Sequence, residues 1–307
     1  MKYFYSTLLF LLIVSQSNAQ QVQDYNLYSK NLFLINPAFA GYSEGASIFL
    51  QARSAFRGVD NAPRNFTVGF SAPIERFSLG TGAKINIDQR GIFQTFSADI
   101  AAAYKLIYKY KHVFSFGMDI GFVNRSYNLN GLNGKVDMAD PTLTSDYFNK
   151  TYFKSGVGVS YISPNAEVGI AFPMLIESEQ EINTNLNAYA GYKFSASDAI
   201  LLKPSGYFRT VANGSVQGDI NFMAEWKKMI WVQPGFRSNM TFLLSAGFGF
   251  PYGSIGYSFN YYSGAYKNVD LNAHEFFLVL NLGGNNGKAA FTGDRKAGQQ
   301  LPKKKRN

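Results

Sequence analysis

Apolar and polar residues alternate one by one along most of the chain after residue 45. In 113–123 the apolar positions are Phe114, Phe116, Met118, Ile120 and Phe122, with Ser115, Gly117, Asp119 and Gly121 between them. Segments 65–72, 79–88 and 254–261 repeat this scheme. Successive side chains of a strand point to opposite faces, so this period of two predicts β-strands with one apolar face and one small, polar face.

Fourteen segments carry this pattern or a close variant of it, and an even number suits a single-chain bacterial barrel. The predicted strands are 46–53, 65–72, 78–88, 93–106, 112–123, 152–161, 166–172, 187–194, 200–208, 216–225, 230–237, 240–249, 253–261 and 272–282.

The character of the two faces separates a membrane barrel from a soluble β-sandwich, which also alternates. The apolar face is rich in Phe and Tyr, and the other face is mostly Gly and Ser with a few charges. The stretch 114–122 has the length of about 9–11 residues that a tilted spanning strand needs. Lipid cannot satisfy an open strand edge, so the sheet has to close. We therefore predict an all-β, transmembrane antiparallel barrel of the bacterial outer membrane.

The connections between predicted strands sort into two classes. If the first strand starts in the periplasm, the even connections are periplasmic turns, and 73–77, 107–111, 162–165, 195–199, 226–229 and 250–252 are all short. The odd connections include the longer segments 54–64, 124–151, 173–186, 209–215 and 262–271; only those near 89–92 and 238–239 are short. This predicts that 128–148 is extracellular and that 226–229 is periplasmic.

Aromatic residues gather where predicted strands meet the short turns. Trp226 and Trp231 flank Lys227 and Lys228, and Tyr104, Tyr108 and Tyr110 surround another turn. Aromatic belts of this kind mark a membrane surface. The plainer interpretation is the general preference of aromatic residues for strands.

The N-terminus predicts export. Lys2 precedes the apolar run 8–14, and small residues at Ser17 and Ala19 fit a cleavage site that leaves Gln20 first. The run is too short to span a membrane, which takes about 20 apolar residues.

The net charge of +9 belongs mostly to the C-terminal tail. After residue 282 the chain has seven Lys and Arg residues and one acidic residue, Asp294, so the tail carries +6. Lys2 in the signal segment adds +1, which leaves a net charge of about +2 for the body of the chain. We expect no nucleic-acid partner, and we interpret 283–307 as a flexible, basic, periplasmic tail, because an even number of strands returns the chain to its starting side.

No catalytic centre, cofactor site or metal site is predicted. Without cysteine there is no thiolate chemistry, and His112 and His274 have no identifiable partners. Two acidic groups could bind a divalent cation, although solvated loops explain them better: Glu177, Glu179 and Glu181, and Asp137 with Asp140. The glycines between Gly247 and Gly253 do not have the spacing of a phosphate loop. We therefore expect a non-enzymatic protein.

Residues 31–41, NLFLINPAFAG, indicate a particular protein family more specifically than the alternating strands do. They closely resemble the N-terminal signature N-x-x-x-I-N-P-A-x-A-G of the PorP/SprF family, outer-membrane proteins of type IX secretion and gliding motility in Bacteroidetes. Further segments resemble the family in order: 57–63, 112–117, Asp140-Pro141, 156–161 and 272–275, which is similar to the "S-H-E" that opens its last strand. The resemblance covers about 24–282. The chain departs from it at Phe56, where the family commonly has Trp, and in the tail 283–307.

The resemblance implies a part in the export or surface attachment of proteins with type IX C-terminal signals, and adhesins are the cargo that we expect. It also implies periplasmic, peptidoglycan-linked partner components. Asn36, Pro37, Ala38 and Gly41 are the candidate docking residues, although Asn36-Pro37 with Gly41 also suits a simple turn before the first strand.

We expect four parts: a signal peptide at 1–19, a periplasmic or plug segment at 20–45, the barrel at 46–282 in outer-membrane lipid, and the tail 283–307. The main alternative function is a channel for a small solute, because the small inner faces of about fourteen strands leave room in the lumen. An outer-membrane lipase is a remote third, since no nucleophile motif is present.

Overall fold

The protein is described by a computed structural model that places residues 25–43, 45–56, 61–109, 112–127, 150–177, 185–210, 216–263 and 272–282. The predicted signal peptide, the tail, Tyr110, Asp137, Asp140, Glu179 and Glu181 lie outside these residues.

The described chain is almost entirely strand after residue 45. The strands are β1 (Ala46–Ala55), β2 (Arg64–Ile74), β3 (Leu79–Arg90), β4 (Phe93–Tyr108), β5 (His112–Tyr127), β6 (Lys150–Ile162), β7 (Ala166–Glu177), β8 (Leu186–Tyr192), β9 (Phe194–Ser195), β10 (Ile200–Thr210), β11 (Val216–Trp226), β12 (Ile230–Arg237), β13 (Thr241–Phe250), β14 (Gly253–Tyr262) and β15 (Ala273–Leu282).

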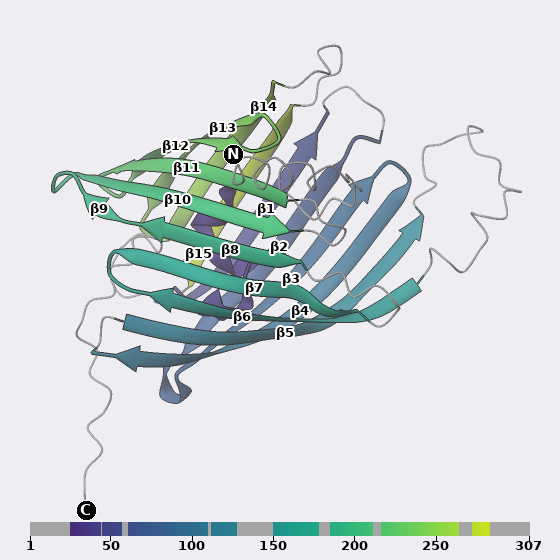
Figure 1. Ribbon diagram of the computed structural model, residues 1–307, viewed down its shortest axis with the longest axis horizontal. Helices are drawn as coiled ribbons and strands as arrows, with labels where there is room; N and C mark the ends of the chain where they lie inside the picture. Colours follow the sequence, from purple (N-terminus) through teal and green to yellow (C-terminus); the bar gives the residue numbers. More distant parts are fainter. Residues whose placement is uncertain are drawn as a thin grey trace, which may run out of the picture.

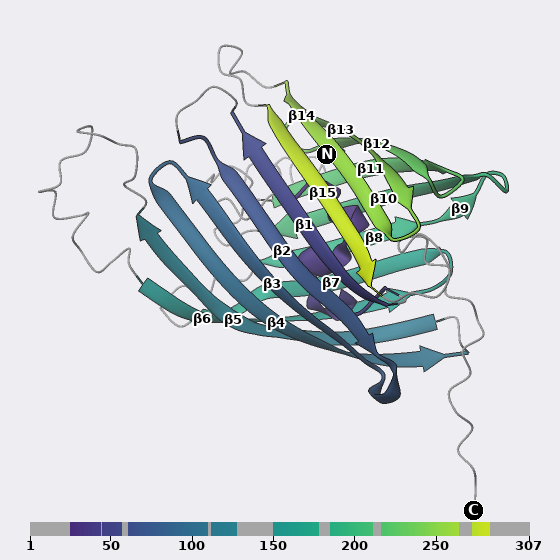
Figure 2. The same ribbon diagram turned by 180° about the vertical axis from the view of Figure 1, so that it is seen from behind.

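These strands form one closed antiparallel sheet. Each pairs with its neighbours along the chain, and β1 pairs with β15 from Ala46↔Leu282 to Ala55↔Ala273. Figure 2 shows β15 in yellow beside β1 in purple, where the barrel closes. Segments β8 and β9 are two parts of one crossing strand, separated at Lys193. The barrel therefore has 14 crossing strands, and the predicted fold class is confirmed.

Several boundaries differ from the prediction. β7 runs to Glu177 rather than to residue 172, because the apolar stretch Phe172–Ile176 continues the strand past Pro173. β6 begins at Lys150 and β5 ends at Tyr127, so these strands extend farther from the short turns than their alternation alone indicates.

The wall separates its two faces as the alternation predicts. On β5 the side chains of Phe116 and Met118 are 53% and 55% exposed, whereas those of Ser115 and Asp119 are 1% and 3% exposed. The outward face carries large apolar residues on every long strand. A band of this kind suits the hydrocarbon of a bilayer.

The two ends of the barrel differ. One end, called here the short-turn end, carries the connections 75–78, 109–111, 163–165, 196–199, 227–229 and 251–252. The other, the long-loop end, carries 56–63, 91–92, 128–149, 178–185, 211–215, 238–240 and 263–272. Figure 1 shows the strands running between these ends.

The prediction that Trp231 belongs to the aromatic belt is wrong. Trp226, Tyr104 and Tyr108 are exposed on the outer face near the short turns, but Trp231 is 2% exposed and points into the barrel. The cause is the parity of β12, where Ile230 and Val232 face outward and the residue between them must face inward.

Within the described residues, no helix has the length and apolar character that crossing a membrane requires.

Candidate functional site in the barrel lumen

The lumen is occupied by the chain that precedes β1. Residues 25–43, called here the lumen segment, form three short 3₁₀ helices: η1 (Leu27–Lys30), η2 (Leu32–Leu34) and η3 (Pro37–Phe39). Nearly all of their side chains are buried. The purple ribbon inside the wall in Figures 1 and 2 is this segment.

Local sequence explains these short turns. The Asn31 side chain accepts a hydrogen bond from the Phe33 backbone N–H at the start of η2. The Asn36 side chain accepts one from Ala38 N–H at the start of η3, where Pro37 occupies the first turn. Asn caps and a first-turn Pro begin helices, and their close repetition here keeps each helix to about one turn.

The signature residues contact the inner wall directly. Asn36 Nδ2 donates to the carbonyl oxygens of Val159 at 3.1 Å and Ile170 at 3.3 Å, on β6 and β7. The carbonyl oxygen of Ala38 accepts from Ser115 Oγ of β5 at 2.7 Å. The sequence candidates Asn36, Pro37 and Ala38 are therefore brought together against one part of the wall.

Glycines make this close approach possible. A Cβ atom at Gly117 would overlap the Ala38 backbone, and one at Gly158 would overlap Asn36 Oδ1. A Cβ at Gly169 would lie 2.8 Å from Asn36 Nδ2. Any larger residue at these wall positions would push the signature out of its place, since a packed interior has no spare volume.

Gly41 ends the signature at the short-turn end. Its φ of +59° is a conformation that side chains with a Cβ rarely adopt. Its N–H donates to Ser71 Oγ at 2.7 Å, and its carbonyl oxygen accepts from the Lys105 ammonium. Gly41 thus turns the chain out of the lumen towards β1 while remaining bonded to the wall.

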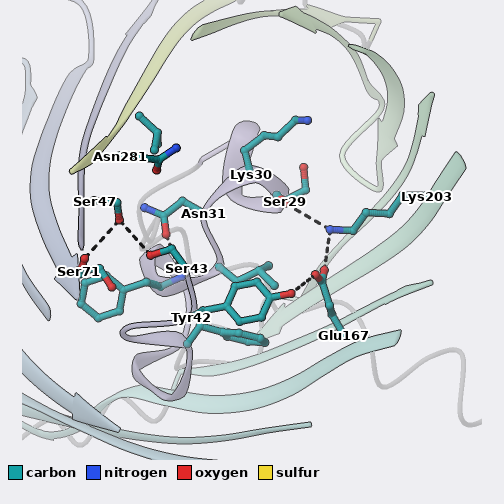
Figure 3. A pocket seen from close by; sticks show the side chains of 14 residues that line it. Ser29, Lys30, Asn31, Tyr42, Ser43, Ser47, Ser71, Glu167, Lys203 and Asn281 are labelled. Carbon is teal, nitrogen blue, oxygen red and sulfur yellow. Dashed lines mark hydrogen bonds and ion pairs between the residues drawn. The ribbon is translucent and has the colours of Figure 1, made fainter. Parts of the chain in front are cut away.

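A buried charge cluster lies beside this exit. Glu167 contacts the ammonium groups of Lys193 and Lys203 and accepts a hydrogen bond from the Tyr42 hydroxyl at 2.6 Å. Figure 3 shows Tyr42 and Lys203 converging on Glu167 at the edge of a small cavity with a mixed polar and apolar lining. That cavity has a volume of about 40 Å³, which is room for only a few waters.

The start of the lumen segment is held near the long-loop end. Glu275 of β15 accepts the backbone N–H groups of Asn26 at 2.9 Å and Leu27 at 2.9 Å, and the side-chain amide of Gln51 at 2.5 Å. These are the free N–H groups at the start of η1, which a carboxylate satisfies well. Arg237 forms a two-pronged ion pair with Asp219 and donates to the Tyr25 carbonyl oxygen at 3.3 Å.

Helix η1 packs on β10, β11 and β12. The Tyr28 ring lies 4.6 Å from that of Tyr207, and the Tyr28 hydroxyl accepts from Asn221 Nδ2 at 2.6 Å. Lys30 Nζ lies 3.7 Å from Glu225 and 4.0 Å from the centre of the Trp231 ring. Burial lowers the pKa of the Lys30 ammonium to about 7, and Glu225 opposes that shift.

The remaining sequence candidates do not join this site. His112 lies 2.7 Å from the Tyr161 hydroxyl, and His274 lies 2.5 Å from that of Tyr257. These two pairs lie at opposite ends of the barrel wall. Among the described residues, no group of three or more His, Asp or Glu side chains is placed to hold a metal ion.

Sequence reasoning missed most of the wall partners. Glu167, Arg237 and Asp219 were visible only as occasional charges on the small face of the strands. A charged residue on the inward face of a strand indicates a buried partner, because burying an unpaired charge costs free energy. Glu275 lay within a family-like segment, but nothing in the pattern pointed to Asn26.

Comparison with known proteins gives a family match and distant structural likenesses. The family model described as "Type IX secretion system membrane protein PorP/SprF" matches residues 17–280. No curated protein matches the chain.

Among solved structures, Omp33 of Acinetobacter baumannii has 7% identity and a TM-score of 0.49, over 79% of this chain and 100% of its own. The Pseudomonas putida toluene transporter TodX has 7% identity and a TM-score of 0.48, over 87% and 95%. The monoaromatic hydrocarbon channel CymD has 13% identity and a TM-score of 0.46, over 87% and 95%.

Proposed function

Because this chain belongs to the PorP/SprF family of type IX secretion system membrane proteins, we propose that it supports the export or surface attachment of secreted proteins without catalysing a reaction. The cargo we expect is an adhesin that carries a type IX C-terminal signal. The partners we expect are periplasmic components linked to peptidoglycan, with the barrel resident in outer-membrane lipid.

The observation that carries this proposal is the way the family signature is used. The signature residues dock the lumen segment on the inner wall. They are Asn36, Pro37, Ala38 and Gly41. Residues that a family shares for transporting a solute would be expected to line an open path. Here they hold the lumen segment against the inner wall instead, which supports an assembly or secretion role.

A solute channel is the alternative function. It requires a continuous aqueous path between the barrel ends, and the buried lumen segment lies inside the barrel where such a path would run. A cavity of about 40 Å³ lies beside Lys30 and Lys203. The channel hypothesis would be favoured if the lumen segment left the barrel under ordinary conditions.

The test is deletion of the gene in its native host, with quantitative proteomics of the surface and culture-medium fractions and growth on limiting solutes. We expect proteins with type IX signals to decrease at the surface or in the medium, and solute-limited growth to stay unchanged. Restoration by the native gene is the control. Unchanged proteomes together with impaired growth on one solute would support the channel instead.

The basic tail has a place in the same proposal. β15 ends at Leu282 at the short-turn end, so residues 283–307 begin on the side that we expect to be periplasmic. We expect the +6 tail to contact acidic groups of a periplasmic partner, of peptidoglycan or of lipid headgroups. Truncation after Gly284 should then reduce recovery of partners at low salt, where the screening length is about 10 Å at 0.1 M.

A further inference from the structure

Three ladders between the described strands are interrupted. One interruption is a register shift between β6 and β7, where the pairing passes from Ser155↔Ile176 to Val157↔Phe172. The other two lie one on each side of the β10–β11 hairpin. Between β10 and β8/β9 the pairing stops at Ser205↔Gly191 and resumes at Leu202↔Phe194. Between β11 and β12 it stops at Asn221↔Gly235 and resumes at Ala224↔Val232. In both places the register is the same on the two sides of the gap, so these are missing pairs rather than bulges.

A proline lies at each gap. Pro204 lies in the first gap and Pro234 in the second, and proline has no N–H to donate to a ladder. Continuing the register places Phe222 of β11 opposite both of them, because Pro204 pairs with Phe222 within the hairpin. The two gaps therefore lie at one height of the wall.

Such gaps are costly in a membrane, where lipid offers no hydrogen bonds to the backbone groups left over. Proline is accordingly rare in central strands of sheets. The ladder inside the hairpin is by contrast complete, from Ile200↔Trp226 to Thr210↔Val216. The ladder of the hairpin is thus continuous within itself and interrupted on both sides.

The inner face of this hairpin holds the first helix of the lumen segment. Asn221 and Tyr207 contact Tyr28, and Glu225 contacts Lys30. Apolar side chains lie on both sides of the gap: Phe222 faces outward, and the buried Met223 and Trp231 face the lumen behind it. Only one wall layer separates bilayer hydrocarbon from Met223 and Trp231, which share the inner face with Gln233 and Lys30.

From this arrangement we propose that the paired strands β10 (Ile200–Thr210) and β11 (Val216–Trp226) are a movable section of the wall that opens the lumen sideways to the bilayer. The class of molecule that fits the opening is an acyl chain, which would enter past Phe222 and contact Trp231. Because Tyr28 and Lys30 contact the inner face of the hairpin, movement of the hairpin would break these contacts and loosen the lumen segment. This inference rests on the barrel alone and not on the proposed role in secretion.

The test uses Trp231 as an internal probe. The chain has two tryptophans, and Trp226→Phe leaves Trp231 alone. The full-length variant is reconstituted in phosphatidylcholine vesicles with and without brominated acyl chains, which quench tryptophan on close contact. A lock is added as Phe222→Cys with Pro234→Cys, which bridges the second gap. The absence of native cysteine makes the disulfide unambiguous. Continuing the register of β11 and β12 places these two residues opposite each other. Opposed residues of a regular antiparallel ladder lie about 4.5–5.5 Å apart, which is within disulfide range, so the lock forms when the strands come together across the gap.

The matched control lock is Gly206→Cys with Ile220→Cys, two residues that pair directly inside the hairpin, so this disulfide crosses no gap. We expect brominated lipid to quench Trp231 in the reduced proteins and in the oxidised control, and the quenching to be lost on oxidation of the Phe222–Pro234 lock. Equal quenching in locked and reduced protein, or none in any form, overturns the proposal.

A second measurement serves if the lock does not form. Hydrogen exchange in the same vesicles should be faster in β10 and β11 than in β4 and β5, and Pro204→Val with Pro234→Val should slow it. Exchange in β10 and β11 as slow as in β4 and β5, unaltered by these substitutions, would show that the gaps are static.

Discussion

Glu275 Oε1 lies 2.9 Å from the backbone nitrogen of Leu27, although 248 residues separate the two along the chain. The last strand of the barrel thus begins by capping the first helix of the lumen segment. The same strand closes the wall on β1. Closure of the barrel and capture of the lumen segment therefore depend on one short stretch of sequence.

Replacing this carboxylate should loosen the lumen segment. Glu275→Ala leaves the N–H groups of Asn26 and Leu27 without their acceptor, at roughly 1–3 kcal/mol for each buried donor left unpaired. Glu275→Gln keeps the shape and one acceptor oxygen, so it should cost less. Urea unfolding of the reconstituted proteins measures the free energy of unfolding, which should decrease from the native protein to Glu275→Gln and again to Glu275→Ala. An alanine variant as stable as the native protein would contradict the capping role.

The glycine wall behind the signature gives a steric prediction. Gly158→Val should expel Asn36 from its place, because even a Cβ would overlap Asn36 Oδ1. Ser29→Cys, a buried position, reports the effect as faster reaction with a water-soluble thiol reagent. Gly218→Ala is the control, since nothing lies within 4 Å of its added Cβ. Equal reaction rates in both backgrounds would argue against docking of the signature on β6.

The outward face gives a prediction about lipid. Met118→Arg places a charge in the middle of β5 on the exposed side and should destabilise the barrel by about 2–4 kcal/mol if it lies near the bilayer midplane. Met229→Arg, in a short turn, should cost only about 0–1 kcal/mol. Folding into vesicles over a urea series compares them. An equal loss of stability in the two variants would show that Met118 does not face the hydrocarbon of the bilayer.

Sidedness follows from the lengths of the connections. Ser238→Cys, at the long-loop end, should react with an impermeant thiol reagent on intact cells. Lys228→Cys, at the short-turn end, should react only after the outer membrane is broken. Both positions are exposed. The opposite pattern would invert the orientation of the barrel.

The wall was predictable from the sequence because alternation in a strand depends on each residue and its immediate neighbours. Phe116, Met118 and Ser115 already reveal which side each will face. Trp231 lies close to a turn, which indicates a belt position, but the parity of its strand places it on the inner face. Counting from Ile230 would have turned it inward.

The lumen segment was harder to predict, since its residues have no period and its partners are distant. Asn36 binds Val159 and Ile170, which are 123 and 134 residues away. The family-like signature marked Asn36, Pro37, Ala38 and Gly41 as special, yet nothing local specified a partner. Only closure of the barrel brings Gly117, Gly158 and Gly169 around them.

The most direct test of a closed lumen is the conductance of the purified native protein in planar bilayers. With Asn36–Gly41 docked and Tyr25–Lys30 capped, we predict no steady open-channel current at moderate voltage, and current steps only in a variant such as Gly158→Val that displaces the segment. A large, steady conductance from the native protein, unaltered by Gly158→Val, would contradict the account.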